Sequence, residues 1–251
     1  MRSDIKQMLF CSAIALCLTL LHGAAQGSNL NLDSTQEVLS LDGVEDLTLA
    51  GGLTFEVICG ATNEVRIITR EPTAFKTRRR GNELSIKRKS LKQFLTLDKQ
   101  DTRVHVVMTS QGALPHLEFD TGVSGDVRTC LQSQPLMQLN VATGSKVRLF
   151  ASDIGELSIT ASTGSDVEVV DMVSVRQLFL KLSTGSHFYG GPKFRATAAR
   201  VMASTGSHAN VCGADLVTGK AATGSSIRVS DQASVEIKSS ITGGNIRQGA
   251  C

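Results

Sequence analysis

The 251 residues include 26 Lys and Arg against 23 Asp and Glu, which leaves a formal net charge of +3. A charge this balanced argues against a dedicated nucleic-acid binder, because such proteins carry a basic excess. Hydrophobic residues make up 41% of the chain and aromatic residues 4%, so we expect a core of small and aliphatic side chains, unlike that of most α/β enzymes.

The N-terminal segment is predicted to be a secretory signal peptide. Arg2 and Lys6 precede an apolar run of about 14 residues, shorter than the roughly 20 residues that a membrane-spanning helix needs. Gly23 and Ala25 are small residues at positions suited to signal peptidase, so cleavage is expected after Ala25. We therefore expect residues 1–25 to be removed and residues 26–251 to form one exported domain without an integral membrane segment.

Residues 33–115 are predicted to form short strands without a clear repeat. Leu53, Phe55, Val57 and Cys59 alternate with other residues, as expected for a strand that buries one face. The stretch KRKSLKQFLTLDKQ lacks such alternation and is predicted to be a loop or an irregular hairpin. This region is expected to be an initial turn of the repeats that follow or a cap over their apolar end.

Residues 116–251 contain a regular repeat marked by the tripeptide Thr-Gly-Ser. Five full copies and two looser ones begin at Thr121, Thr143, Thr163, Thr184, Thr205, Thr223 and Thr242. The intervals run from 18 (223−205) to 22 (143−121) residues, so each repeat is one structural unit. Apolar and polar residues alternate around each tripeptide, as Leu157, Ile159, Val167 and Val169 illustrate, and this period of two indicates strands.

These patterns predict an all-β fold, a single-stranded parallel β-helix or solenoid with rungs of about 20 residues. Each repeat would contain a strand, a glycine bend and a second strand, whose apolar face only stacking can bury. No helical period of 3.6 residues is present, and antiparallel hairpins would need turn signals every 8 to 12 residues. The rungs are expected to stack about 4.8 Å apart.

The Thr-Gly-Ser column allows two interpretations. Thr143 and Ser145 share the parity of the apolar residues Val141 and Val147. Unless the glycine bend resets the alternation, both side chains point inward and form hydrogen-bonded ladders, and Thr163→Lys would then unfold the middle rungs. The alternative is an outward array of hydroxyls that matches ice or another lattice, and the shared parity argues against it.

The outward columns show no catalytic constellation. Lys146 is expected to pair with Asp166, and Arg148 with Glu168, between neighbouring rungs. Acid–base cleavage of a polysaccharide needs two carboxylates close together, and no two carboxylates occupy neighbouring positions in these columns. We therefore predict no catalytic residues.

His187 and His208 occupy equivalent positions of adjacent repeats, so their side chains are expected to stack about 4.8 Å apart. Two imidazoles fall short of the three or four ligands of a metal site, and Asp166 is the one obvious addition. The sequence therefore predicts surface histidines, with no metal site and no cofactor.

Two outward surfaces are candidates for binding a partner. One suits hydrogen bonding to polar polymers such as glycans, and it consists of Asp166, Glu168, His187, Tyr189 and His208. The other suits anionic polymers or protects a strand edge from aggregation, and it consists of Arg78, Arg79, Arg80, Lys87, Arg88 and Lys89. Nucleic acid is not expected as a partner, because aromatic residues for base stacking are nearly absent.

The ordered set of segments resembles the putative auto-transporter adhesin head GIN domain family of secreted bacterial proteins. The segments that carry the resemblance are the opening strands LDGVEDLTLAGGLTFEVICGATNEVRIITR, the strand RRRGNELSIKR, the lead-in RVHVVMTSQGALPHLEFDTGVSGDV and the Gly-Ser rungs. The resemblance implies a right-handed β-helix outside the cytoplasmic membrane, and it implies little about chemistry.

Four cysteines remain after signal cleavage, and export would place them in an oxidising compartment: Cys59, Cys130, Cys212 and Cys251. Cys130 and Cys251 belong to the first and last rungs, about 29 Å apart, whereas a disulfide tolerates about 7 Å between Cα atoms. Cys130 and Cys212 are too far apart for the same reason. What remains is Cys59–Cys130 together with Cys212–Cys251, or free thiols.

The sequence thus predicts an exported, non-enzymatic protein of the cell envelope or surface, an adhesion-type or polymer-binding module. It is expected in the periplasm, at the cell surface or outside the cell, with a cell-surface glycan or envelope polymer as its partner. The alternatives are a polysaccharide-active enzyme on the same scaffold and a purely structural envelope protein. The oligomeric state stays open.

Overall fold

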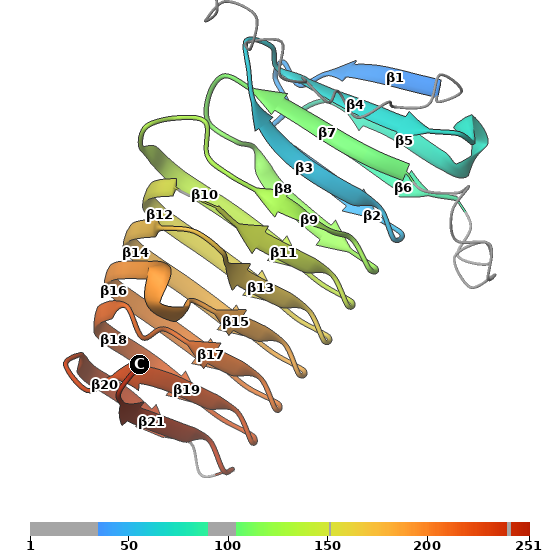
Figure 1. The fold of residues 1–251 in the computed structure, drawn as a ribbon. Helices are drawn as coiled ribbons and strands as arrows, with labels where there is room; N and C mark the ends of the chain where they lie inside the picture. Colours follow the sequence, from blue (N-terminus) through green and yellow to red (C-terminus); the bar gives the residue numbers. More distant parts are fainter. Residues whose placement is uncertain (1–34, 90–103, 151, 240–241) are drawn as a thin grey trace, which may run out of the picture. The chain divides into compact units, whose positions relative to one another are not determined.

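The computed structural model describes residues 35–89, 104–150, 152–239 and 242–251, which are almost entirely β structure (Figure 1). The expected signal peptide, residues 1–25, lies outside these ranges, as does most of the predicted loop KRKSLKQFLTLDKQ. Short 3₁₀ helices at Pro72–Ala74 and Gly191–Lys193 interrupt the described strands. No helix in these ranges is long and apolar enough to cross a membrane.

The described strands form two sheets. The eleven-stranded sheet has the order β1 (Thr35–Ser40), β4 (Glu64–Thr69), β7 (Val104–Ser110), β3 (Thr54–Cys59), β9 (Ser124–Val127), β11 (Lys146–Leu149), β13 (Asp166–Val169), β15 (His187–Tyr189), β17 (His208–Asn210), β19 (Ser226–Ser230) and β21 (Asn245–Gly249). The ten-stranded sheet has the order β20 (Ser234–Ser239), β18 (Ala214–Ala221), β16 (Phe194–Ala203), β14 (Val173–Leu182), β12 (Ser152–Ala161), β10 (Gln134–Val141), β8 (His116–Asp120), β2 (Asp46–Ala50), β6 (Glu83–Arg88) and β5 (Phe75–Arg80).

From β8 onward the chain coils regularly, as the green to red rungs of Figure 1 show. In the ten-stranded sheet β12 pairs in parallel with β10 and β14, and in the eleven-stranded sheet β13 pairs in parallel with β11 and β15. Each rung crosses from the ten-stranded to the eleven-stranded sheet at a Thr-Gly corner, and in five of the seven corners the next residue is Ser. The predicted fold class, a parallel β-solenoid, is confirmed.

The strands before β8 mix parallel and antiparallel pairing. β2 and β3 form an earlier rung in parallel register with β8 and β9, and Gly51 and Gly52 occupy its corner. β4 pairs antiparallel with β1 and β7, and β5 pairs antiparallel with β6. These strands extend both sheets beyond the rungs, and β5 is the outermost described strand of the ten-stranded sheet.

The core between the sheets is built from alternate residues of each strand, and most of them are small or aliphatic. Four of its aromatic residues form two pairs. Phe55 stacks on Phe119 with 4.3 Å between ring centroids, and Phe188 meets Phe194 edge-on at 5.5 Å. The period-two pattern of the sequence therefore places the apolar side chains inward, as predicted.

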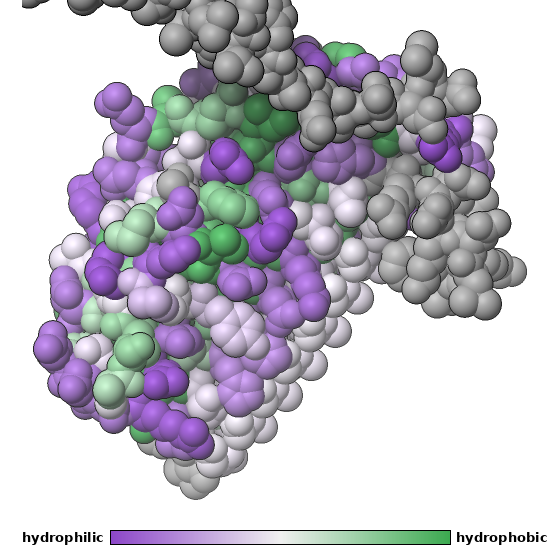
Figure 2. All heavy atoms as spheres, in the orientation of Figure 1, coloured by the Kyte–Doolittle hydropathy of each residue, from purple (hydrophilic) through white to green (hydrophobic). Residues whose placement is uncertain are grey.

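The corners turn through two consecutive residues with positive φ. The first of them has φ between 49° and 58° and is Thr121, Thr143, Thr163, Thr184, Thr205 or Thr223. The second is glycine with φ between 68° and 74°. Positive φ costs glycine little, whereas it strains the β-branched Thr before it. In Figure 2 these corners run as a pale diagonal edge of near-neutral hydropathy.

This turn resets the alternation of side chains. In the five full copies of the tripeptide the Thr side chains are exposed, whereas Ser145, Ser165, Ser186, Ser207 and Ser225 are at most 1% exposed. The prediction that both hydroxyls point inward is therefore confirmed for Ser and wrong for Thr. The physical reason is the left-handed conformation of Thr, which points its side chain out of the core.

Hydrogen bonds connect each corner to the next. The Ser186 hydroxyl donates to the carbonyl of Ala161 in the preceding rung at 2.9 Å, and it accepts from the amide of Ser183 at 3.0 Å. The Gly164 amide donates to the carbonyl of Thr184 in the following rung, also at 2.9 Å. Other rungs repeat both patterns, so the buried polar groups of the corner are satisfied.

Two disulfides are present, and they have the pairing that the rung spacing left open. Cys59 at the end of β3 joins Cys130 after β9, with 5.1 Å between Cα atoms. Cys212 joins Cys251 with a Cα separation of 5.9 Å, because the chain returns across β19 after β21. The first bond connects the N-terminal strands to the regular rungs.

Candidate functional site

The outer face of the eleven-stranded sheet carries an aligned column of polar side chains. Parallel register places Lys146, Asp166, His187, His208 and Ser226 side by side on β11, β13, β15, β17 and β19. Because parallel neighbours lie about 4.8 Å apart, each of these side chains reaches the next. The column predicted from the repeat is therefore a continuous surface feature.

Contacts run the length of this column. Lys146 Nζ lies 3.6 Å from Asp166 Oδ2, so the predicted ion pair is confirmed. Asp166 Oδ1 is 2.9 Å from His187 Nδ1. The rings of His187 and His208 stack nearly parallel with 5.3 Å between centroids, and His208 Nδ1 lies 2.6 Å from Ser226 Oγ.

A second column lies beside the first, and its charges pair differently from the prediction. Arg148 donates two hydrogen bonds to Asp126 on β9, at 2.7 and 2.8 Å, instead of pairing with Glu168 on β13. Both carboxylates lie in register with Arg148, one on each side, and the guanidinium adopts the bidentate geometry with Asp126. Glu168 therefore stays available beside Tyr189.

Tyr189 completes the patch as an exposed hydrogen-bond donor. Its ring is 47% exposed and stacks on His187 at 5.6 Å. Partial burial, and after it the carboxylates of Asp166 and Glu168, raise the pKa of the Tyr189 phenol above its usual range. The phenol consequently keeps its proton at neutral and mildly alkaline pH.

We call Asp166, Glu168, His187, Tyr189 and His208 the His–Tyr patch. The structure brings all five together on three adjacent strands, β13, β15 and β17. They present two carboxylates, two imidazoles and a phenol on an open face, a set that can hydrogen-bond several hydroxyls of one ligand. In the described ranges no group of three or more His, Cys, Asp or Glu could hold a metal ion.

The six basic residues expected to form one surface lie on two faces. Arg78, Arg80 and Lys87 are exposed on the outer face of β5 and β6. Arg79 points to the other side, where it donates to the carbonyls of Ser40 and Asp42. The expectation of a single patch is wrong because side chains alternate along a strand, so consecutive arginines diverge.

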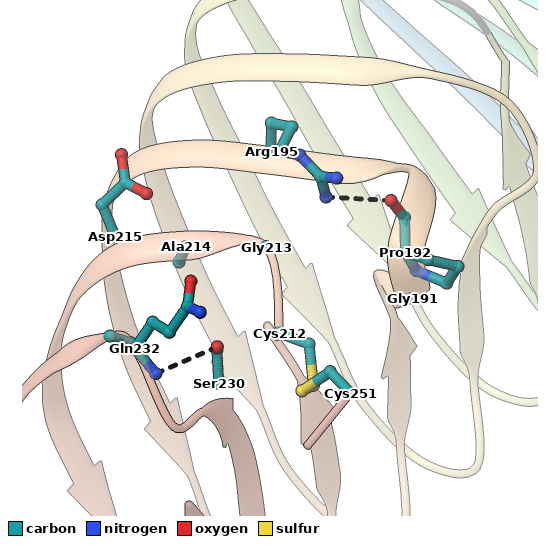
Figure 3. A pocket seen from close by; sticks show the side chains of 11 residues that line it. Gly191, Pro192, Arg195, Cys212, Gly213, Ala214, Asp215, Ser230, Gln232 and Cys251 are labelled. Atoms are coloured by element: carbon teal, nitrogen blue, oxygen red, sulfur yellow. Dashed lines mark hydrogen bonds between the residues drawn. A yellow bond between two sulfur atoms is a disulfide. The ribbon is translucent and has the colours of Figure 1, made fainter. Parts of the chain in front are cut away.

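A hollow at the connections between the two sheets has no signal in the repeat pattern of the sequence. It measures about 470 Å³ and is lined by Arg195, Asp215, Gln232 and the Cys212–Cys251 disulfide, among others (Figure 3). Arg195 is held in place by hydrogen bonds to the carbonyls of Pro192 and Phe194, both at 2.8 Å. The lining comes from connections of different rungs and from the strand ends beside them, and these connections vary in length and carry no repeated motif.

Known proteins support the same fold. The family model described as "Putative auto-transporter adhesin, head GIN domain" matches residues 44–233. A putative adhesin from Bacteroides fragilis is 9% identical with a TM-score of 0.64, and the match covers 87% of this chain and 98% of that one. No curated protein sequence matches the chain.

Two further solved structures are similar. A putative lipid binding protein from Parabacteroides distasonis is 14% identical, with a TM-score of 0.56 and coverage of 88% of this chain and 98% of that one. A putative adhesin from Parabacteroides merdae is 10% identical, with the same TM-score and coverage of 88% and 97%. At these identities the likeness concerns the fold alone.

Proposed function

Because the chain belongs to the family described as "Putative auto-transporter adhesin, head GIN domain", we propose that it is an exported, non-enzymatic adhesion module that binds polar glycans through the His–Tyr patch. The resemblance stated from the sequence is confirmed by the family match. Surface or exported location and an adhesive role fit the family description. The ligand and the binding residues are our proposal.

The observation that carries the proposal is the continuous set of contacts from Lys146 to Ser226. His187 is fixed between Asp166 at 2.9 Å and the ring of His208, so its position is set before any ligand arrives. Preorganised polar groups lose little entropy on binding. Tyr189 adds an exposed aromatic face beside them, and aromatic residues are enriched where binding energy concentrates.

An extended face, and not a closed pocket, suits a polymer. The patch spans three rungs, or about 10 Å along the stack, so successive sugar units can contact successive strands. Retaining glycosidases hold two carboxyl groups about 5 Å apart across the scissile bond, with one protonated. Asp166 is instead engaged with Lys146 and His187, which favours binding over hydrolysis.

A glycan array with matched variants tests the proposal. We expect Tyr189→Ala/His208→Ala to weaken binding about tenfold or more, since it removes two ring surfaces and their hydrogen bonds. The control, Phe179→Ala/Met202→Ala, removes comparable exposed surface from β14 and β16 in the other sheet and should bind as wild type does. Equal binding by all three proteins would refute the patch as the site.

Two further measurements address the remaining parts of the proposal. Cell fractionation should recover the protein outside the cytoplasmic membrane, and recovery in the cytoplasm would contradict export. Each bound glycan should remain intact after prolonged incubation with the protein. Release of new reducing ends would instead show that the chain is a polysaccharide-active enzyme.

A further inference from the structure

We propose that the outer face of β5 and β6 binds a linear polysaccharide that carries repeated carboxylate or sulfate groups. The site is a hollow of about 300 Å³, which we call the basic groove, and its cations are Lys76, Arg78, Arg80 and Lys87. It lies in the other sheet from the His–Tyr patch. The inference therefore stands whether or not the patch binds glycans.

The sheet brings like charges together in this groove. Lys76 lies directly opposite Lys87 in the antiparallel register of β5 and β6, and Arg78 and Arg80 follow on the same face. All four side chains are exposed. Like charges directly opposite each other destabilise a strand pair. Glu83, opposite Arg80, is the one carboxylate that lines the groove.

No hydrogen bond or ion pair to another described residue engages these four cations. Several basic side chains elsewhere on the described surface do have partners. Arg148 pairs with Asp126, Lys146 pairs with Asp166, and Arg79 binds carbonyl groups. Among the described residues, the basic groove thus gathers four cations around one carboxylate, that of Glu83.

An unsatisfied hydroxyl lies in the same groove. Ser85 Oγ is buried and has no hydrogen-bond partner, although Ser85 lies opposite Arg78 on one side and Thr48 on the other. The Thr48 hydroxyl is committed to Glu118 at 2.8 Å. A buried hydroxyl without a partner is costly, and rotation of the Ser85 side chain toward the groove would let it donate to an anionic oxygen held by the surrounding cations.

The spacing of the cations selects the ligand. Lys76 and Arg80 are separated by about 14 Å along β5, at about 3.4 Å per residue, which exceeds the reach of a single phosphate or carboxylate. Among the described residues that line the groove, none is an aromatic side chain that could stack on a nucleobase, and Leu84 is the one apolar residue. A chain with regularly repeated anionic groups fits both observations.

Binding of polygalacturonate and of dextran sulfate, with dextran as the neutral reference, tests the proposal. Lys76→Gln/Arg78→Gln/Lys87→Gln should weaken binding of one or both anionic polymers about tenfold or more. The control, Lys181→Gln/Arg200→Gln/Lys220→Gln, removes the same charge from the outer face of β14, β16 and β18 and should change affinity less than about twofold. Wild-type affinity should fall at high salt, because screening shortens the range of these interactions.

A second variant checks the groove without changing its charge. Ser85→Ala should leave thermal stability unchanged or slightly raised, since the hydroxyl has no partner in the free protein, and should weaken polymer binding severalfold. Equal losses of affinity in the groove and control variants would show that only the net charge of the protein matters, and this would overturn the proposal. So would binding to phosphatidylglycerol vesicles without binding to either polymer, or binding to dextran as strong as to its sulfate.

Discussion

The regular rungs and the N-terminal strands solve the same problem of burying an apolar face in different ways. From β8 onward each strand has parallel neighbours one rung away, and charges pair across them, as Lys146 does with Asp166. Before β8, the sheets include the antiparallel pairs β1–β4, β4–β7 and β5–β6. In the last of these pairs Lys76 lies directly opposite Lys87. The repeated rungs thus determine the fold, whereas the antiparallel strands outside the repeat create a surface with a different distribution of charge.

The free energy of unfolding should differ most between the two regions when a buried aromatic side chain is replaced by alanine. Phe188→Ala in β15 is expected to cost about 3 to 5 kcal/mol, because Phe188 is fully buried between strands on both sides. Phe75→Ala in the outermost strand β5 should cost less, since one neighbouring strand and easier relaxation limit the cavity. Urea unfolding measures both, and equal costs would show that the two regions unfold as one equally packed unit.

The Cys59–Cys130 disulfide should matter at the junction of the two regions. Cys59→Ser/Cys130→Ser is expected to lower stability by about 2 to 4 kcal/mol, because it frees a loop with a sequence separation of 71 residues. Hydrogen exchange should accelerate in β3, β4 and β7 and remain slow in β13 to β17. Uniform acceleration through the rungs would contradict this division.

Within the rungs, the buried corner hydroxyls should contribute next. Ser186→Ala removes the hydroxyl's two hydrogen bonds but leaves the direct bond from the Ser183 amide to the Ala161 carbonyl at 3.0 Å, so the expected cost is about 0.5 to 1.5 kcal/mol. Ser174→Ala, at an exposed position of β14, serves as the control and should be nearly neutral. Thermal melting compares the two variants. Identical melting temperatures would show that the corner hydroxyls do not contribute to stability.

The smallest effect is expected at the exposed Thr column. Thr163→Asn should be neutral or stabilise the protein by up to about 1 kcal/mol, because Asn tolerates the left-handed conformation better than a β-branched residue. Thr163→Lys should change stability by about 0.5 kcal/mol or less, since the side chain points to solvent. Unfolding of the Lys variant would restore the inward column expected from parity.

Much of the fold could be read from the sequence because the pattern repeats. Val167 and Phe188 mark the inward face through their period-two spacing, and the even intervals between tripeptides require stacked rungs. The orientation of Thr163 could not be predicted, because the corner resets the alternation only when both Thr163 and Gly164 adopt positive φ, which Thr rarely does. The backbone conformation of the turn, and not the residue composition, therefore decides whether the Thr side chain points inward or outward.

The sequence predicted which residues of the site lie on neighbouring strands, but it did not predict which side chains bind each other. The rung spacing places Asp166, His187 and His208 side by side, as the structure does. Arg148 has a carboxylate on either side, Asp126 and Glu168, so side-chain geometry alone decides which one it binds. The basic groove likewise depends on a hairpin register that pairs Lys76 with Lys87, which the sequence does not specify.

The corner hydrogen bonds also bear on how such a chain can change length during evolution. The Gly164 amide bonds to the Thr184 carbonyl and the Gly185 amide to the Thr205 carbonyl, and the same bond joins the corners from Thr121 to Thr223. Duplication of the segment between two corners would insert a rung whose buried groups all find partners. Unequal intervals are absorbed at the opposite connections, where the hollow beside Arg195 lies. The gene can therefore lengthen or shorten by whole rungs, and new surfaces can arise without redesign of the core.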